Sequence, residues 1–180
     1  KIMHERTMEN LRRLLKANVT DLYRIYGPEY ATPPYLPPSL FERFVLPYVS
    51  EMTRTIHEKG SLVRVHSHGK IGKVLDMIIE TGADSIDPCE APPDGDISLA
   101  EAKKRCINKM SIFGNIQLKY LEHSTPDEVS KAVIQCMNEA KDGYGYAIMP
   151  TAEPINIPFS KKTEENYYVF IETALKYGIY

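Results

Sequence analysis

The stretch Ser61-Leu62-Val63-Arg64-Val65-His66-Ser67-His68-Gly69 joins a short β-branched run to a pair of histidines. A second run, Ala83-Asp84-Ser85-Ile86, leads in the same way into Asp87-Pro88-Cys89-Glu90. Alternate residues of a strand share one face, so the first run predicts a strand that presents His66 and His68 on the same side. If the second run is the neighbouring parallel strand, Glu90 lies beside them. Two imidazoles and a carboxylate at strand ends are typical of a metal site or an acid–base site.

On either side of these two runs, short apolar segments alternate with helical patterns along the chain. We expect strands at 21–26, 62–65, 85–87, 110–113 and 146–149, and helices at 6–17, 39–59, 71–80, 98–107, 125–141 and 162–177. This alternation predicts an α/β fold of about five parallel strands with right-handed crossovers and the helices outside. A closed (β/α)8 barrel needs about 250 residues. The chain has 180 residues, so the sequence predicts either an open sheet or a partial barrel that lacks its start.

Capping signals mark two helix starts. Thr125-Pro126-Asp127-Glu128 combines a capping threonine, a proline in the first turn and a glutamate three residues after the cap. Ser39 with Glu42 predicts a second capping box. Pro47 lies inside the helix expected at 39–59 and predicts a kink there.

Composition limits the classes of function. The length suits one domain over residues 1–180, and the formal charge of −2, without a basic block, argues against nucleic-acid binding. No apolar run approaches the roughly 20 residues of a membrane span, so no membrane contact is expected. Three cysteines without paired spacing (Cys89, Cys106 and Cys136) indicate reduced thiols and a cytoplasmic protein.

Acidic residues follow the other expected strands. Glu29 comes after the first strand and Glu153 after the last, where barrel enzymes carry functional groups, although either residue also suits a solvated loop. Arg64 shares the face of His66 one layer deeper. A buried arginine needs an acidic partner, which Asp84, Asp87 or Glu29 could supply.

Several stretches, taken in order, resemble the uroporphyrinogen decarboxylase family. They are Pro37-Pro38-Ser39-Leu40-Phe41, Pro47-Tyr48, Val65-His66-Ser67-His68-Gly69, Asp87-Pro88-Cys89-Glu90-Ala91-Pro92-Pro93, Gly95-Asp96 and Phe113-Gly114-Asn115-Ile116-Gln117. The resemblance covers nearly the whole chain but only the C-terminal part of a family member. Because the family fold is a (β/α)8 barrel, the resemblance implies about five of its eight units.

The resemblance also implies a metal. The family's zinc-dependent methyltransferases, which move methyl groups between corrinoid proteins and thiols, have His-x-Cys on one strand and a later cysteine near the last strand. Here His66 keeps its place, His68 stands at the cysteine position, and Thr151-Ala152-Glu153 stands at the position of the later cysteine. The related cobalamin-independent methionine synthase has a glutamate ligand at a spacing similar to that of Glu90. The implied ligands are His66, His68, Glu90 and Glu153, and their nitrogen and oxygen donors suit zinc, iron, manganese or cobalt.

Three functions stay open from the resemblance. The first, which the retained histidine pair favours, is metal-dependent methyl transfer from a corrinoid, held by a corrinoid protein, to a small thiol or similar acceptor. The second is tetrapyrrole decarboxylation in porphyrin biosynthesis, in which Asp87 or Glu29 protonates or stabilises a pyrrole and Arg24 and Arg64 hold acetate groups. Asn115 is a candidate for substrate binding, or else part of a simple turn. The third is a non-catalytic fragment.

The expected sheet has two open edges, at 21–26 and 146–149. Parallel strands are normally buried on both faces, so an open edge invites pairing with another chain. We therefore expect a homo-oligomer, a swapped arrangement, or a missing N-terminal barrel segment that covers both edges.

Overall fold

The computed structural model describes residues 2–179, and its strands form one parallel sheet in the order β1-β2-β3-β4-β5. The strands are β1 (Leu22–Ile25), β2 (Leu62–His66), β3 (Ser85–Asp87), β4 (Ser111–Phe113) and β5 (Tyr146–Ala147). The register places Arg24 beside Arg64, and His66 beside Asp87. The prediction of five parallel strands is confirmed.

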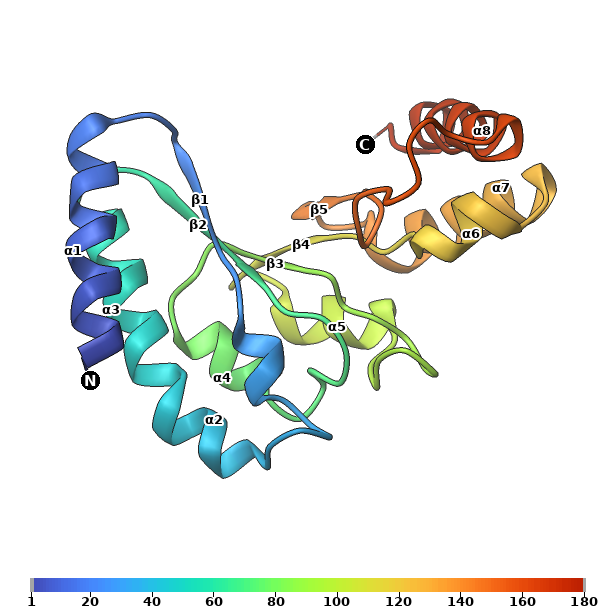
Figure 1. Ribbon diagram of the computed structural model, residues 1–180. Helices are drawn as coiled ribbons and strands as arrows, with labels where there is room; N and C mark the ends of the chain where they lie inside the picture. The colour runs from blue at the N-terminus through green and yellow to red at the C-terminus, as the bar shows by residue number, and fades with distance from the viewer. Residues whose placement is uncertain (1, 180) are drawn as a thin grey trace.

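Helices cover the outer side of the sheet. They are α1 (Ile2–Ala17), the 3₁₀ helix η1 (Pro28–Ala31), α2 (Pro38–Phe44), α3 (Leu46–His57), α4 (Leu75–Glu80), α5 (Leu99–Cys106), α6 (Leu118–His123), α7 (Pro126–Ala140) and α8 (Lys161–Tyr177). Figure 1 shows α1 and α3 running beside each other at one end of the sheet, and α6, α7 and α8 grouped at the other end. Among the helices of residues 2–179, none has both the length and the hydropathy of a membrane span.

The capping box at the start of α7 is confirmed. The Thr125 hydroxyl accepts a hydrogen bond from the backbone N–H of Glu128, and the Glu128 carboxylate accepts one from the backbone N–H of Thr125 at 2.7 Å. The second expected capping box is wrong, because α2 begins at Pro38 after Pro37 and has no side-chain cap.

The expected kink at Pro47 is a full break. The helix expected at 39–59 divides at Val45 into α2 and α3, and Pro47 lies in the first turn of α3. Proline has no N–H to donate, and the first turn is the part of a helix that needs none. Two further differences are that α4 begins only at Leu75, and that α6 was not expected.

The apolar core has two clusters that meet. The larger lies between the sheet and α1 to α5, and the smaller joins α6, α7 and α8 around Leu121, Val133 and Phe170. Val63 and Val65 of β2 point into the larger cluster and are buried. Since side chains alternate along a strand, Arg64 and His66 lie on the opposite, inner face of the sheet. The apolar core therefore directs the polar residues of β2 away from the helices.

The two end strands of the sheet, β1 and β5, each pair with a single neighbour among residues 2–179. A cavity of about 480 Å³ runs between α1 and β1 and is lined by Leu11, Leu14 and Tyr23, among others. The expectation that another chain or segment covers these edges stays a prediction.

Candidate functional site

Asp87, the last residue of β3, is the centre of a buried charged cluster. It is 1% exposed. Arg24 of β1 donates Nη2 to Asp87 Oδ2 in a short ion pair, and Arg64 Nε of β2 lies 3.2 Å from Oδ1. Burial raises the pKa of Asp87, but hydrogen bonds from His66 and Arg24 outweigh burial and hold that pKa below its ordinary value. Two guanidinium groups thus face one carboxylate and leave an excess of positive charge.

His66, at the end of β2, completes this cluster. Its Nδ1 lies 2.8 Å from Asp87 Oδ2 and 2.6 Å from Arg24 Nη2. The Arg24 guanidinium can only donate and the ionised carboxylate can only accept, so these two contacts of Nδ1 require opposite tautomers of the ring. Because Arg24 Nη2 already has Asp87 Oδ2 as its acceptor, we assign the His66 tautomer with the proton on Nδ1, facing Asp87, which leaves Nε2 as the nitrogen available to a ligand.

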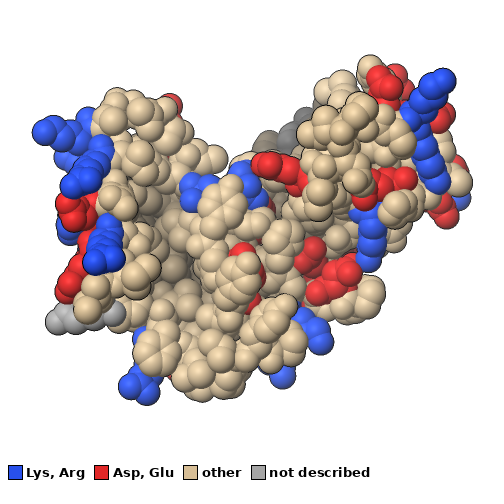
Figure 2. All heavy atoms as spheres, viewed as in Figure 1, with Lys and Arg blue, Asp and Glu red and all other residues tan. Residues whose placement is uncertain are grey.

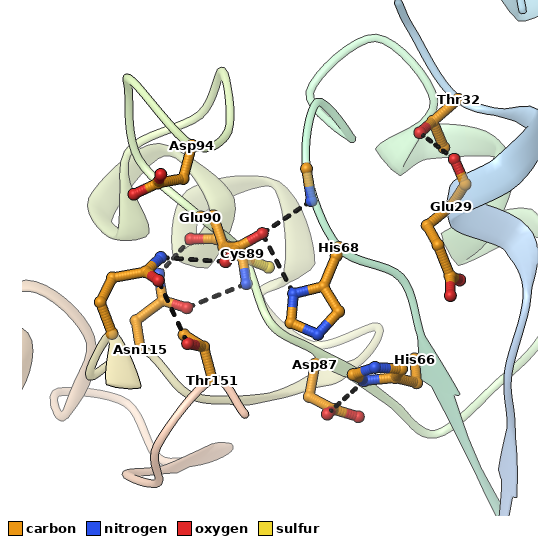
Figure 3. A network of polar contacts seen from close by, with 12 residues as sticks. Glu29, Thr32, His66, His68, Asp87, Cys89, Glu90, Asp94, Asn115 and Thr151 are labelled. Carbon is orange, nitrogen blue, oxygen red and sulfur yellow. Dashed lines mark hydrogen bonds and ion pairs between the residues drawn. The ribbon is translucent and has the colours of Figure 1, made fainter. Parts of the chain in front are cut away.

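Glu90 holds the second histidine. Its Oε2 accepts from the backbone N–H of Gly69 at 2.7 Å and from His68 Nδ1 at 3.3 Å, and its Oε1 accepts from Gln117 Nε2 at 2.9 Å (Figure 3). Burial raises the pKa of Glu90, but these three hydrogen bonds lower it to about 2. In return, the hydrogen bond that His68 donates to Glu90 raises the pKa of His68 despite partial burial, and the charge of Glu29 adds to this effect. The site therefore contains a permanent carboxylate beside a readily protonated imidazole.

The two histidines face one cavity. Their rings meet edge to face with centroids 4.6 Å apart. Both line a cavity of about 380 Å³, together with Arg24 and Tyr26 of the β1 end and Glu153 after β5. The surface is notched between the N-terminal and the C-terminal helices, and basic atoms lie at the bottom of this notch (Figure 2). A small ligand with an anionic group suits such a cavity.

Glu29 and Asn115 are not among the residues that line this cavity. The Glu29 carboxylate accepts from the backbone N–H of Gly27 at 3.0 Å, and it acts on the site through its charge near His68. The amide of Asn115 is occupied by the backbone of Cys89, whose N–H donates to Oδ1 at 3.0 Å and whose carbonyl accepts from Nδ2. Asn115 therefore holds the end of β3, and its expected contact with substrate stays a prediction.

Cys89 packs in the core of the protein. Its side chain is fully buried, and burial raises the pKa of its thiol well above the ordinary value. A thiol that stays protonated neither attacks nor binds a metal. Cys89 therefore supplies no thiolate to the site.

Sequence reasoning missed three residues at the site. Tyr26 accepts from Arg24 Nη1 at 2.8 Å and stacks against that guanidinium group, while Gln117 and Thr151 connect Glu90 to the end of β5. Tyr26 had a signal, because it lies two residues after Arg24 and so shares its face. Gln117 and Thr151 follow irregular strand ends, where residue spacing does not predict a direction.

The expected metal-ligand set is not assembled. Within residues 2–179, no three His, Cys, Asp or Glu side chains lie together so that they could hold a metal ion. His66 and His68 each direct one nitrogen at a carboxylate, and the oxygens of Glu90 already accept three hydrogen bonds. These residues do not fit a metal centre as they lie.

Metal binding at this place stays a prediction that elemental analysis can check. If a metal binds through the histidine pair, His66→Ala should abolish the metal content of the purified protein. His123→Ala, which changes an exposed histidine elsewhere, should leave it unchanged. Equal metal content in all three proteins would indicate adventitious binding.

Low pH should destabilise the protein through Glu90. Its pKa is about 2 in the folded protein against an ordinary value of 4.5, so folding favours the ionised form. This stabilisation is complete above pH 4.5 and is lost as the pH falls from 4.5 towards 2, and it amounts to up to about 3 kcal/mol. Urea unfolding of wild type and Glu90→Gln at about pH 6 and about pH 3 measures it. The acid-induced loss should be smaller in the variant, and an equal loss in both would contradict the prediction.

Parallel strands with outer helices, and polar side chains at the carboxyl ends of the strands, define part of a (β/α)8-type barrel. The chain belongs to the uroporphyrinogen decarboxylase (URO-D) family, whose model matches residues 2–174. Among solved structures, a methyltransferase from Methanosarcina mazei is similar, with a TM-score of 0.72 and 15% sequence identity. The match covers 91% of this chain and 44% of that chain, so this chain spans less than half of that methyltransferase. The comparison with curated proteins gave no match.

Proposed function

We propose that this URO-D-family chain is part of an enzyme that activates a small thiol or hydroxyl acceptor for methyl transfer. One observation carries the proposal: two imidazoles, each with Nδ1 on a buried carboxylate, face one cavity beside Arg24. The likeness to a protein described as a methyltransferase agrees with this reaction class. The chain would supply the groups that bind the acceptor and remove its proton.

His66 is the proposed base. The acceptor binds in the cavity with its proton towards His66 Nε2, and the proton moves to that nitrogen. Asp87, which already holds Nδ1–H, stabilises the resulting imidazolium. Arg24 and protonated His68 stabilise the acceptor anion, because both carry positive charge at the wall of the same cavity.

The activated acceptor then attacks a methyl carbon. The bond between the acceptor atom and carbon forms as the bond between carbon and the donor breaks, and the electron pair stays on the donor. A corrinoid, when bound as donor, supplies a methyl group that can leave its electrons behind in this way. Tyr26 and Glu153 form part of the wall of the cavity in which the acceptor binds.

Decarboxylation is the second candidate, and the arginine pair favours it. Arg24 and Arg64 direct two positive charges at the single carboxylate of Asp87, so a substrate carboxylate would find uncompensated charge there. Asp87 itself is a poor proton donor in this setting, because its pKa is lowered and it is already paired. Glu29 would then have to serve as the proton donor.

Assays of the full chain separate these readings. The protein is mixed with methylcobalamin and a set of small thiols and alcohols, and the methylated acceptor is measured by mass spectrometry. Parallel reactions contain uroporphyrinogen and are followed by CO₂ release. We expect acceptor methylation that depends on the protein. CO₂ release without methylation would favour the decarboxylase reading, and inactivity in both assays would favour a non-catalytic fragment.

A further inference from the structure

A chain of hydrogen bonds crosses the ends of four neighbouring strands and stops at His68. Thr151, after β5, donates its hydroxyl to Gln117 Oε1 at 3.2 Å. Gln117, after β4, donates Nε2 to Glu90 Oε1 at 2.9 Å, and Glu90, after β3, accepts from His68 Nδ1, after β2. Figure 3 shows Glu90 between the Asn115–Thr151 side of the site and the ring of His68. Neither Gln117 nor Thr151 takes part in the proton transfer described above.

We propose that Gln117 and Thr151 are positioning residues, which fix the direction of the His68 ring through Glu90. The inference rests on the proposed function in one respect: it takes His68 to stabilise the acceptor anion. Its physical basis is independent of the reaction, because it concerns only which hydrogen bonds hold the ring.

The backbone fixes both ends of this chain of contacts. Ile116 donates its N–H to Met149 O at 3.1 Å, and Thr151 donates its N–H to Ile116 O at 2.8 Å. These bonds continue the pairing of β4 with β5, and Ile116 forms a parallel bridge with Pro150. Thr151 is 3% exposed, so water competes little for its hydroxyl. The Thr151 hydroxyl and the Gln117 amide are therefore held within reach of each other by the sheet.

The Glu90 carboxylate sets which group donates and which accepts in each hydrogen bond of this series. Ionised Glu90 can only accept, so the Gln117 amide must turn its NH₂ group towards Glu90 and its carbonyl towards Thr151. A flipped amide would place two oxygens against each other. The Thr151 hydroxyl then has to donate. Each group thereby orients the next group in the series. The last one is His68, whose Nδ1–H donates to Glu90, so that its Nε2 is the ring nitrogen available at the cavity.

Removal of the Thr151 hydroxyl should make the orientation of the His68 ring less fixed, because the ring is the last group in this series of hydrogen bonds. Thr151→Val keeps the shape of the side chain but removes the hydroxyl that donates to the half-buried amide oxygen of Gln117. The amide can then rotate away from Glu90, and Glu90 can turn about its remaining bond to Gly69. Gln117→Met removes the amide altogether. Thr151→Ser keeps a hydroxyl at this position and serves as the matched control.

The test uses the ring nitrogens of His68 in ¹⁵N NMR, at a pH where the ring is neutral, with His68→Gln to assign the signals. Wild type and Thr151→Ser should each show one tautomer with the proton on Nδ1. Thr151→Val and Gln117→Met should show a mixture of tautomers, with far-ultraviolet circular dichroism confirming that each variant is folded. A single unchanged tautomer in both variants would overturn the proposal.

Kinetics form the second arm. In Thr151→Val, kcat should fall on the order of 10-fold, less than the roughly 100-fold that a 1 Å displacement of a reacting group can cost. KM should stay within about twofold, since the acceptor keeps its contacts with Arg24. If the tautomer changes but neither wild type nor any variant transfers a methyl group, the proposed function is contradicted and the positioning role stands. Normal kinetics together with a changed tautomer would overturn the role of this chain of contacts in catalysis.

Discussion

Asp87→Asn should destabilise the protein by about 3–5 kcal/mol, the largest stability effect we expect from one substitution. Asp87 is buried and faces the guanidinium groups of Arg24 and Arg64, whose side chains are 19% and 16% exposed. A neutral amide leaves two positive charges close together with little water to solvate them. Urea unfolding followed by circular dichroism measures the loss as a lower midpoint at an unchanged slope.

An exposed ion pair provides the control for this measurement. Asp94 pairs with Lys119, and both side chains are far more exposed than Asp87, at 40% and 50%. Asp94→Asn should therefore change the free energy of unfolding by no more than about 1 kcal/mol. If Asp87→Asn and Asp94→Asn unfold at the same urea concentration, the charged cluster does not stabilise the fold in the way described.

His66→Ala should reduce methyl transfer by about 10²- to 10⁴-fold, the range that a positioned general base contributes. The proposed mechanism gives His66 the only proton-transfer step, and Asp87 supports that step from Nδ1. The loss should appear in kcat more than in KM, because Arg24 and Tyr26 still line the cavity for the acceptor.

A second variant tests whether the loss of activity is specific to His66 or follows from replacing any histidine. His123 is exposed, with 77% of its side chain accessible, and lies outside the cavity. His123→Ala should keep wild-type turnover. An active His66→Ala protein would show that another group takes the proton, and His68 would then be the residue to test.

The architecture of this protein was predictable from local patterns. The β-branched run that ends at His66 and the shorter run that ends at Asp87 are both strands, and they pair in parallel as expected. The capping signal at Thr125 marks the start of α7. Strand periodicity also brought His66 and His68 to one place, because a period of two residues is a property of the extended chain itself. These features depend on residues close together in the sequence.

The choice among carboxylates needed the tertiary structure. The sequence offered Asp84, Asp87 and Glu29 as partners for Arg64, and the structure pairs Arg64 with Asp87 while Asp84 binds His57 and the N–H of Val63. The reason is register: Arg64 lies beside Ser85, so Asp87, two residues further on, shares the inner face with Arg64, whereas Asp84 alternates to the other face. Register between strands is decided by packing across the whole sheet, which residue spacing alone does not reveal.

The roles of the loop residues were decided in the same way. Composition and strand patterns predicted an acid–base or metal site at the strand ends, and they could not tell that Glu90 would be occupied by Gly69, His68 and Gln117. Nor could they tell that the amide of Asn115 would bind the backbone of Cys89. Hydrogen bonds between loops depend on where four separate strands end in space. The sequence by itself therefore determined the strands and the face that carries the histidines, and the tertiary structure decided which partner each polar group has.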